Sequence, residues 1–324
     1  MNTVIPLLML LLGTSGVQDP VKTPPVFGVS VENVYIDAFV SQRGAPVTGL
    51  QAADFELSDN GAVQRLEIAA SDAQPLLAVL TFDISGSLSE EKLAALKAAS
   101  QALLESLRPE DEATLFTFSD QVDWLVPPTR EKALVRGALD RLRTGGGTPV
   151  MDALYAAITL PKTQGRTLVV LFTDGVDNMS WLDWRQVQAV AEKSNALVHV
   201  VSLQPPVALV GGGDAPMRFG NRMVPAEGTR ALEFESSFGL RQIAEVTGGR
   251  YWEAESLDRL RTAFTAIAEA MGKRYVLRYA PETASRAGWH KIELKLRGRK
   301  GDVHARSGYW VAPPQEPGDT PGKD

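Results

Sequence analysis

The chain has 324 residues, of which 44% are apolar and 22% charged, a composition typical of a globular protein with one large or two ordinary domains. The formal net charge of −6 argues against a general nucleic-acid binder, which would show a basic patch or stripe. The sequence has no cysteine, which excludes disulfides, zinc–thiolate sites and cysteine nucleophiles.

The N-terminus has the pattern of a secretory signal. An apolar run from Val4 to Leu12 is followed by the small residues at 13–16, although no Lys or Arg precedes it. We expect a signal peptide over 1–18, a proline-rich linker over 19–25, and a periplasmic or extracellular protein. The alternative is an apolar start on a cytosolic protein. The run is shorter than the roughly 20 residues that span a bilayer, and no later run is longer, so we expect no membrane span.

Residues 26–72 have the period-two pattern of β-strands. The stretch "VSVENVYIDAFV" alternates apolar and polar residues, and Asp59-Asn60-Gly61 is a strong hairpin turn between two further strands. This β segment is too short to form a well-buried sandwich by itself.

Residues 75–272 alternate between strands and helices. The run "PLLAVLTF" ends at Asp83 and precedes a helix over 89–107, at whose start Ser87 and Glu90 have capping-box spacing. Two strands around Ser119-Asp120, a helix over 130–142 and the strand "TLVVLFT" before Asp174 follow. The region is completed by the helix "WRQVQAVAEKSN", the strand "ALVHVVSL", the helical start of "GLRQIAEVTGGRYWEA" and a helix over 256–271. This order predicts an α/β fold with a doubly wound, mostly parallel sheet and helices on both faces.

Two other regions lack helical periodicity. Residues 204–235 contain a triple glycine, and we expect disorder or a loose surface lobe there. Residues 273–312 return to period two, and 313–324 have the composition of a disordered tail. The two β flanks are therefore expected to pair in one small β-sandwich into which the α/β domain is inserted. Two independent β units are the alternative.

Oxygen-bearing side chains gather at one edge of the predicted sheet. Sites in open α/β sheets form beyond the carboxyl ends of the strands, where Asp83 and Asp174 both lie. Two neighbouring carboxylates repel unless a cation or a proton separates them. Hydroxyls complete a hard, oxygen-only set of candidate metal ligands: Asp83, Ser85, Ser87, Thr148 and Asp174. The set suits Mg²⁺, for which Mn²⁺ can substitute. The competing interpretation is that these side chains only cap helices.

The segments "DISGS", "TGGGTPVMDAL" and "FTDG" resemble, in this order, the metal-ion-dependent adhesion site of the von Willebrand factor type A domain. The resemblance covers roughly residues 75–272 and matches all five ligand positions of that site. The β flanks also look like those of the bacterial secreted "VWFA-related" proteins known from acidobacteria. The resemblance implies a protein partner whose acidic side chain supplies a further ligand to the metal, with some ligands acting through water.

Enzyme signatures are weak. The sequence has no G-x-S-x-G, H-E-x-x-H or phosphate-binding lysine loop, and His199 lies in a buried strand where a core role is favoured. We therefore expect a binding module rather than an enzyme. A metal-assisted hydrolase and a structural component of an envelope assembly are the alternatives. Trp181 and Trp184 follow the Asp174 loop and are either a partner surface or packed under the next helix, and Asp177 is either a supporting group or a turn residue.

Overall fold

The computed structural model describes residues 33–69, 75–160, 166–203, 217–219, 222–224, 226–281 and 287–311. The expected signal peptide, the linker, the C-terminal tail and much of 204–235 lie outside these residues. No helix in the described part of the chain is long and apolar enough to cross a membrane.

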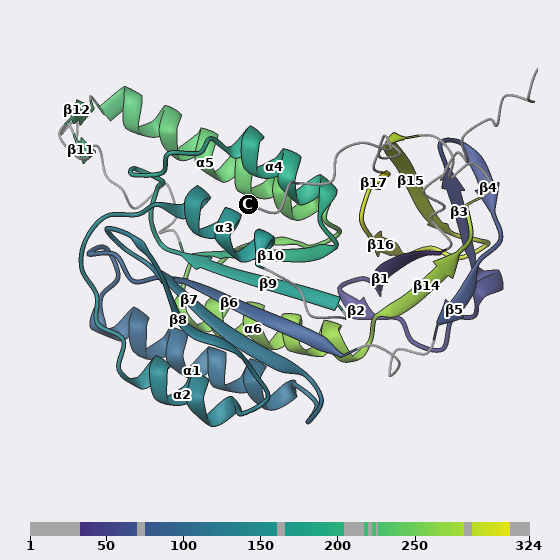
Figure 1. Ribbon diagram of the computed structural model, residues 1–324, viewed down its shortest axis with the longest axis horizontal. Coiled ribbons are helices and arrows are strands. Elements are labelled where there is room, and N and C mark those ends of the chain that lie inside the picture. Colours follow the sequence, from purple (N-terminus) through teal and green to yellow (C-terminus); the bar gives the residue numbers. More distant parts are fainter. Residues whose placement is uncertain are drawn as a thin grey trace, which may run out of the picture.

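Figure 1 shows an α/β domain beside a group of antiparallel strands. The helices are α1 (Glu90–Ser106), α2 (Lys132–Asp140), α3 (Val150–Thr159), α4 (Trp184–Lys193), α5 (Ala226–Val246) and α6 (Leu257–Gly272). The strands of the α/β domain are β6 (Leu76–Asp83), β7 (Glu112–Phe118), β8 (Val122–Thr129), β9 (Arg166–Thr173), β10 (Ala196–Ser202) and β13 (Tyr251–Glu253). The strands of the flanks are β1 (Val34–Gln42), β2 (Ala45–Pro46), β3 (Phe55–Asp59), β4 (Ala62–Gln64), β5 (Glu67–Ala69), β14 (Tyr275–Tyr279), β15 (Gly288–Leu296), β16 (Asp302–His304) and β17 (Gly308–Val311).

The central sheet has the order β13-β10-β9-β6-β7-β8. All neighbouring strands are parallel except β7 and β8, which form an antiparallel hairpin. Residues of β6 alternate between two apolar cores, with Leu80 and Phe82 in one and Leu77 and Val79 in the other. Helices α1, α2 and α6 cover the first face, and α3, α4 and α5 cover the second (Figure 1). The α/β fold with helices on both faces is therefore the one expected from the sequence.

Helix α1 begins differently from the prediction. Its N-cap is Ser89, whose Oγ accepts a hydrogen bond of 3.3 Å from the backbone N–H of Lys92. The predicted capping box of Ser87 and Glu90 is wrong because the Ser87 hydroxyl bonds to Asp174 instead.

The region 204–235 also differs in part from the prediction of a segment without regular structure. Two short strands, β11 (Met217–Phe219) and β12 (Arg222–Val224), pair antiparallel, and α5 already begins at Ala226. Gly228 and Thr229 have low helix propensity, and this obscures the first turns of α5 in the sequence.

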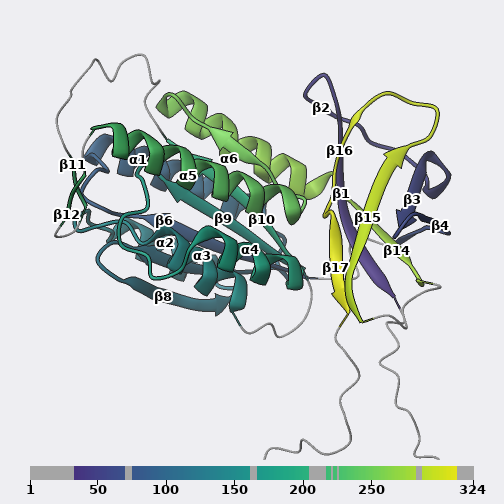
Figure 2. The same cartoon turned by 90° about the horizontal axis from the view of Figure 1, so that it is seen from above.

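Strands from before and after the α/β domain pair with one another. In one sheet β14 lies between β1 and β5, with Ile36 opposite Leu277. In the other sheet β15 lies between β17 and β3, with Leu57 opposite Leu294. Figure 2 shows these strands beside the α/β domain, and apolar residues of both sheets share one core.

A polar network is buried within that shared core. Asp59 is fully buried and accepts hydrogen bonds of 2.9 Å from the hydroxyls of Tyr279 and Tyr309. His290 Nδ1 lies 3.1 Å from the other carboxylate oxygen of Asp59. Because a buried carboxylate is costly unless it is hydrogen-bonded, this network ties β3 to β14, β15 and β17.

Candidate metal centre

The five sequence-predicted residues come together at one end of the central sheet. Asp83 is the last residue of β6, and Asp174 directly follows β9. These strands are parallel neighbours, so their carboxyl ends share one rim. Ser85 and Ser87 lie in the connection from β6 to α1, and Thr148 lies just before α3.

Hydrogen bonds link three of these side chains directly. The Oγ atoms of Ser85 and Ser87 are 2.9 Å apart, and Ser87 Oγ donates to Asp174 Oδ1 at 2.7 Å. A methyl group built on Gly175 would lie 3.5 Å from both Ser87 Oγ and Thr148 Oγ1. The Thr148 hydroxyl therefore faces the same small space as the Ser87 hydroxyl.

Asp83 is the most deeply buried member of the set, with an exposed fraction of 0%. Burial, with a smaller contribution from the nearby charge of Asp174, raises the pKa of its carboxyl to about 6, against hydrogen bonds that lower it. Those bonds come from the Ser85 N–H, 2.9 Å from Oδ1, and the Thr173 hydroxyl, 2.7 Å from Oδ2. The sequence analysis missed Thr173 because it lies within the apolar run of β9.

The glycine-rich loop over residues 145–147 is hydrogen-bonded to the connection from β6 to α1. The Gly145 N–H donates to the Ile84 carbonyl at 2.8 Å, and the Gly86 N–H donates to the Gly146 carbonyl at 3.1 Å. Gly146 has a φ of +85°, and a Cβ on it would lie 2.7 Å from the Asp120 carboxylate. Glycine is therefore required there by both backbone conformation and space.

Residues after Asp174 hold Thr148 and α3 in place. Asn178 Oδ1 accepts from the Thr148 N–H at 2.9 Å, and the Asn178 N–H donates to the Thr148 carbonyl at 3.2 Å. Asp177 Oδ2 accepts from the Met151 N–H, in the first turn of α3, at 2.8 Å and from the Ser180 hydroxyl at 2.6 Å. Asp177 thus both supports α3 and orders its own turn. Asn178 carries no signal in the sequence that would have singled it out.

A lysine neutralises one of the two carboxylates. Lys92 Nζ on α1 lies 2.7 Å from Asp174 Oδ2, and the Asp174 side chain is 0% exposed. The sequence analysis also missed this contact, because the two residues are 82 positions apart.

The two tryptophans have different environments. Trp181 is 95% exposed, and the N–H groups of Trp181 and Leu182 bond to the carboxylate of Asp152, each at 3.0 Å. Trp184 instead packs against α5, with its ring centroid 5.5 Å from that of Phe238. Of these two tryptophans, Trp181 is therefore the one whose side chain is largely exposed.

The donor chemistry of this site fits a hard divalent cation. Of the two buried carboxylates, Asp174 is paired with Lys92, and the hydroxyls of Ser85, Ser87 and Thr148 lie close by. The described residues contain no group of three or more His, Cys, Asp or Glu side chains placed to hold a metal. A cation here would rely on hydroxyl and water ligands, which Mg²⁺ and Mn²⁺ accept.

Residues 78–176 match the family model of the von Willebrand factor type A domain. A "UPF0353 protein" from Mycolicibacterium paratuberculosis is 24% identical over 215 residues, which are 60% of this chain and 60% of that protein. The magnesium-chelatase 67 kDa subunit of Heliobacterium mobile is 32% identical over 110 residues, which are 32% of this chain but only 16% of that protein.

A solved structure described as "von Willebrand factor type A from Catenulispora acidiphila" is 12% identical and covers 88% of this chain and 75% of its own, with a TM-score of 0.47. The family match includes Asp83, the last residue of β6, and Asp174, which directly follows β9. This chain therefore contains a match to the von Willebrand factor type A domain over residues 78–176.

Proposed function

We propose that this protein binds a partner protein through Mg²⁺ held by Asp83, Ser85, Ser87, Thr148 and Asp174, with an acidic side chain of the partner as a further ligand. Mn²⁺ would substitute. The observation that carries the proposal is the pair of buried carboxylates linked to a chain of hydroxyls at the end of two parallel strands. The match of residues 78–176 to the von Willebrand factor type A domain supports it, because a divalent cation at this site mediates protein contacts in such domains.

Each group has a distinct part in this proposal. Asp83, fixed by Thr173 and by the Ser85 N–H, and Asp174, fixed by Ser87, offset the double positive charge. The cation, when bound, supplies an electrophilic position for a carboxylate oxygen. The neutral hydroxyls leave that electrophilic character intact, so a charged partner group is favoured over water.

Trp181 extends the proposed partner surface beyond the cation. Its ring is 95% exposed, and Met179 beside it is 41% exposed. Exposed aromatic rings near the centre of an interface often contribute much of the binding energy. We infer that the partner places an apolar side chain next to its acidic one.

We further propose that the paired flanks, residues 26–72 and 273–312, form one β-sandwich with the α/β domain inserted. The registers between β1 and β14 and between β3 and β15 support this arrangement. The signal-like N-terminus supports a periplasmic or extracellular location. The bacterial secreted "VWFA-related" family remains our hypothesis for the subfamily.

A metal-assisted hydrolase is the alternative function, and the partial match to a magnesium-chelatase subunit keeps an enzymatic role in view. A role as a structural component of an envelope assembly is a second alternative. Isothermal titration of the full chain with Mg²⁺ and Mn²⁺ tests the cation site. We expect saturable binding that Asp83→Ala or Thr148→Ala abolishes, with unchanged circular dichroism. Binding that persists in both variants contradicts the proposal.

A further inference from the structure

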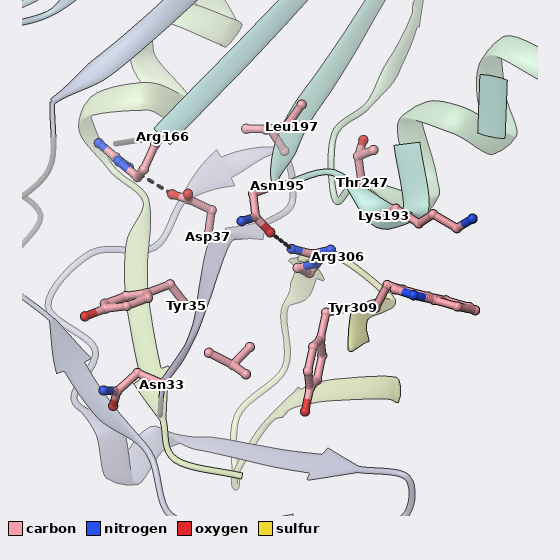
Figure 3. A pocket seen from close by; sticks show the side chains of 13 residues that line it. Asn33, Tyr35, Asp37, Arg166, Lys193, Asn195, Leu197, Thr247, Arg306 and Tyr309 are labelled. Carbon is pink, nitrogen blue, oxygen red and sulfur yellow. Dashed lines mark hydrogen bonds and ion pairs between the residues drawn. The ribbon is translucent and has the colours of Figure 1, made fainter. Parts of the chain in front are cut away.

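A second polar site lies at the other end of the central sheet from the metal centre. A cavity of about 370 Å³ opens between the α/β domain and strands β1 and β17. Figure 3 shows Arg166, at the start of β9, paired with Asp37 of β1 in the wall of this space. Arg306, from the connection between β16 and β17, and Lys193, at the end of α4, also line it. We call this space the interdomain cavity.

The lining of the interdomain cavity has an excess of positive charge. Arg166, Lys193 and Arg306 line it, and Asp37 is the only acidic residue among the described lining residues. Asp37 Oδ1 already lies 2.9 Å from Arg166 Nη1 and 3.7 Å from Nε of Arg274, a fourth cation behind the wall. One carboxylate therefore serves several cations. Lys193 is exposed, but the side chains of Arg166 and Arg274 are largely buried. Because buried charges are normally paired, this imbalance favours an additional anion.

Hydrogen-bond donors are also left over. The Nε atoms of Arg166 and Arg274 are buried without an acceptor among the described residues. The Arg274 side chain is only 2% exposed, and burial lowers the pKa of its guanidinium to about 10. An unsatisfied donor on a buried charged group is costly, so an acceptor beside Arg166, which lines the cavity, would stabilise the folded chain.

Arg306 differs because its guanidinium is held rigidly. Its Nη1 donates to Asn195 Oδ1 at 2.7 Å, and its Nη2 donates to the Ser194 carbonyl at 3.0 Å. Burial also lowers the pKa of Arg306 to about 10. These acceptors fix a positive charge in the wall and connect β17 to the end of α4, yet none of them carries a negative charge.

We propose that the interdomain cavity binds a small oxyanion, a phosphate or carboxylate group, between the cations Arg166, Lys193 and Arg306. Guanidinium groups match the oxygen geometry of both anions, and Lys193 adds a mobile point charge. Tyr35 and Trp310, which are 42% and 43% exposed, flank the opening, and Lys193 Nζ lies 5.0 Å from the Trp310 ring centroid. An anion there would connect the α/β domain to the flanking sheets.

The test uses the full chain after divalent cations have been removed on a chelating resin, so that it does not depend on the metal centre and no soluble carboxylate chelator competes for the cavity. Inorganic phosphate and citrate are titrated separately at constant ionic strength, with calorimetry and thermal unfolding as readouts. We expect saturable binding of at least one anion and a rise in Tm, since a ligand that binds only the folded state stabilises it. Phosphate alone binding identifies a phosphate group as the ligand, and citrate alone binding identifies a carboxylate.

Matched variants place the binding in the cavity. Lys193→Met should weaken it about tenfold, which is the effect of about 1.4 kcal/mol. Asp37→Asn should strengthen it by removing the competing carboxylate. Lys295→Met is the control, because Lys295 is 71% exposed and pairs with Glu293 on β15 outside the cavity. The proposal is overturned if neither anion binds saturably, or if Lys193→Met and Lys295→Met weaken binding equally.

Discussion

Lys92 Nζ lies 2.7 Å from Asp174 Oδ2, which places an ammonium group next to a carboxylate proposed to face Mg²⁺. The Lys92 ammonium group and Mg²⁺ would then compete for the Asp174 carboxylate. Removing Lys92 leaves the buried Asp174 without its counter-charge when no metal is bound, whereas in Mg²⁺ the competition disappears.

We therefore predict opposite effects of Lys92→Met with and without metal. In EDTA the variant should lose about 1–3 kcal/mol of unfolding free energy, because a buried charged acceptor loses its partner. Its affinity for Mg²⁺ should rise. Lys92→Arg, which keeps the charge, is the control for both measurements. If Lys92→Met binds Mg²⁺ no more tightly than the wild type, the proposed competition between Lys92 and Mg²⁺ is contradicted, while the proposed metal site itself is not.

Two buried threonines on neighbouring strands allow a paired test of Asp83. Thr173 Oγ1 donates to Asp83 Oδ2 at 2.7 Å, whereas Thr81 Oγ1 is buried without a hydrogen-bond partner in the described part of the chain. Thr173→Val should weaken Mg²⁺ binding in calorimetry, because it removes a bond that holds Asp83 in place. Thr81→Val should leave Mg²⁺ binding unchanged and be neutral or slightly stabilising, since it removes an unsatisfied hydroxyl. Equal effects of the two substitutions on Mg²⁺ affinity would contradict the role assigned to Thr173.

The sequence predicted those parts of the fold that depend on local pattern. The continuous apolar runs of β6 and β9 locate the sheet. The run of β6 ends at Asp83, and the run of β9 is followed by Asp174. Lys92 and Thr173 could not be predicted, because their roles depend on contacts with residues 82 and 90 positions away. Ser87 shows the same limit, since its local spacing predicts a helix cap while its hydroxyl bonds to a distant side chain.

His199 gives a prediction for acid stability. Burial first, and then the charges of Arg274 and Arg250, lower the pKa of His199 from 6.5 to about 3. Below pH 6.5 the unfolded chain therefore binds a proton that the folded chain does not, so stability falls as the pH falls from 6.5 towards 3. The maximum contribution is about 1.4 kcal/mol per pH unit.

The test of this acid sensitivity is the variant His199→Gln. The His199 Nδ1 atom accepts from the Arg250 N–H at 3.1 Å, and the Gln amide oxygen retains an acceptor for it. Urea unfolding at pH 6, 5 and 4 should show a shallower loss of stability in the variant. Parallel pH profiles for the wild type and the variant would show that His199 is not the group responsible.

Gly146 should tolerate substitution less well than a glycine with the same sign of φ in open space. Gly146→Ala combines a φ of +85° with a contact of 2.7 Å to the Asp120 carboxylate. Gly298→Ala has a φ of +64°, and no atom of a described residue would lie within 4 Å of its Cβ. The control should cost only the backbone strain of about 1–2 kcal/mol. Gly146→Ala should cost more and also weaken Mg²⁺ binding, as measured by urea unfolding and calorimetry; equal losses in both variants would argue against a tight loop.

Substitutions of Trp181 and Trp184 should have different effects, the first on partner binding and the second on the free energy of unfolding. Trp181 is 95% exposed, so Trp181→Ala should change the unfolding free energy by no more than about 0.5 kcal/mol. Trp184 packs so closely on α5 that a Cβ on Gly239 would lie 2.4 Å from the Trp184 Cβ. Trp184→Ala should therefore destabilise the chain, approaching the about 3–5 kcal/mol typical of a core tryptophan.

The partner assay completes this comparison. Once a Mg²⁺-dependent partner is identified, Trp181→Ala should weaken binding of that partner at the same Mg²⁺ concentration as is used for the wild type. The affinity for Mg²⁺ should be unchanged, because the Trp181 ring lies outside the set of metal ligands. Trp181→Phe, which keeps an aromatic ring, should retain most of the binding and so separates loss of the ring from a general disturbance of the loop. If Trp181→Ala binds the partner as tightly as the wild type, Trp181 is not part of the partner surface, and the proposed contact through the cation is unaffected.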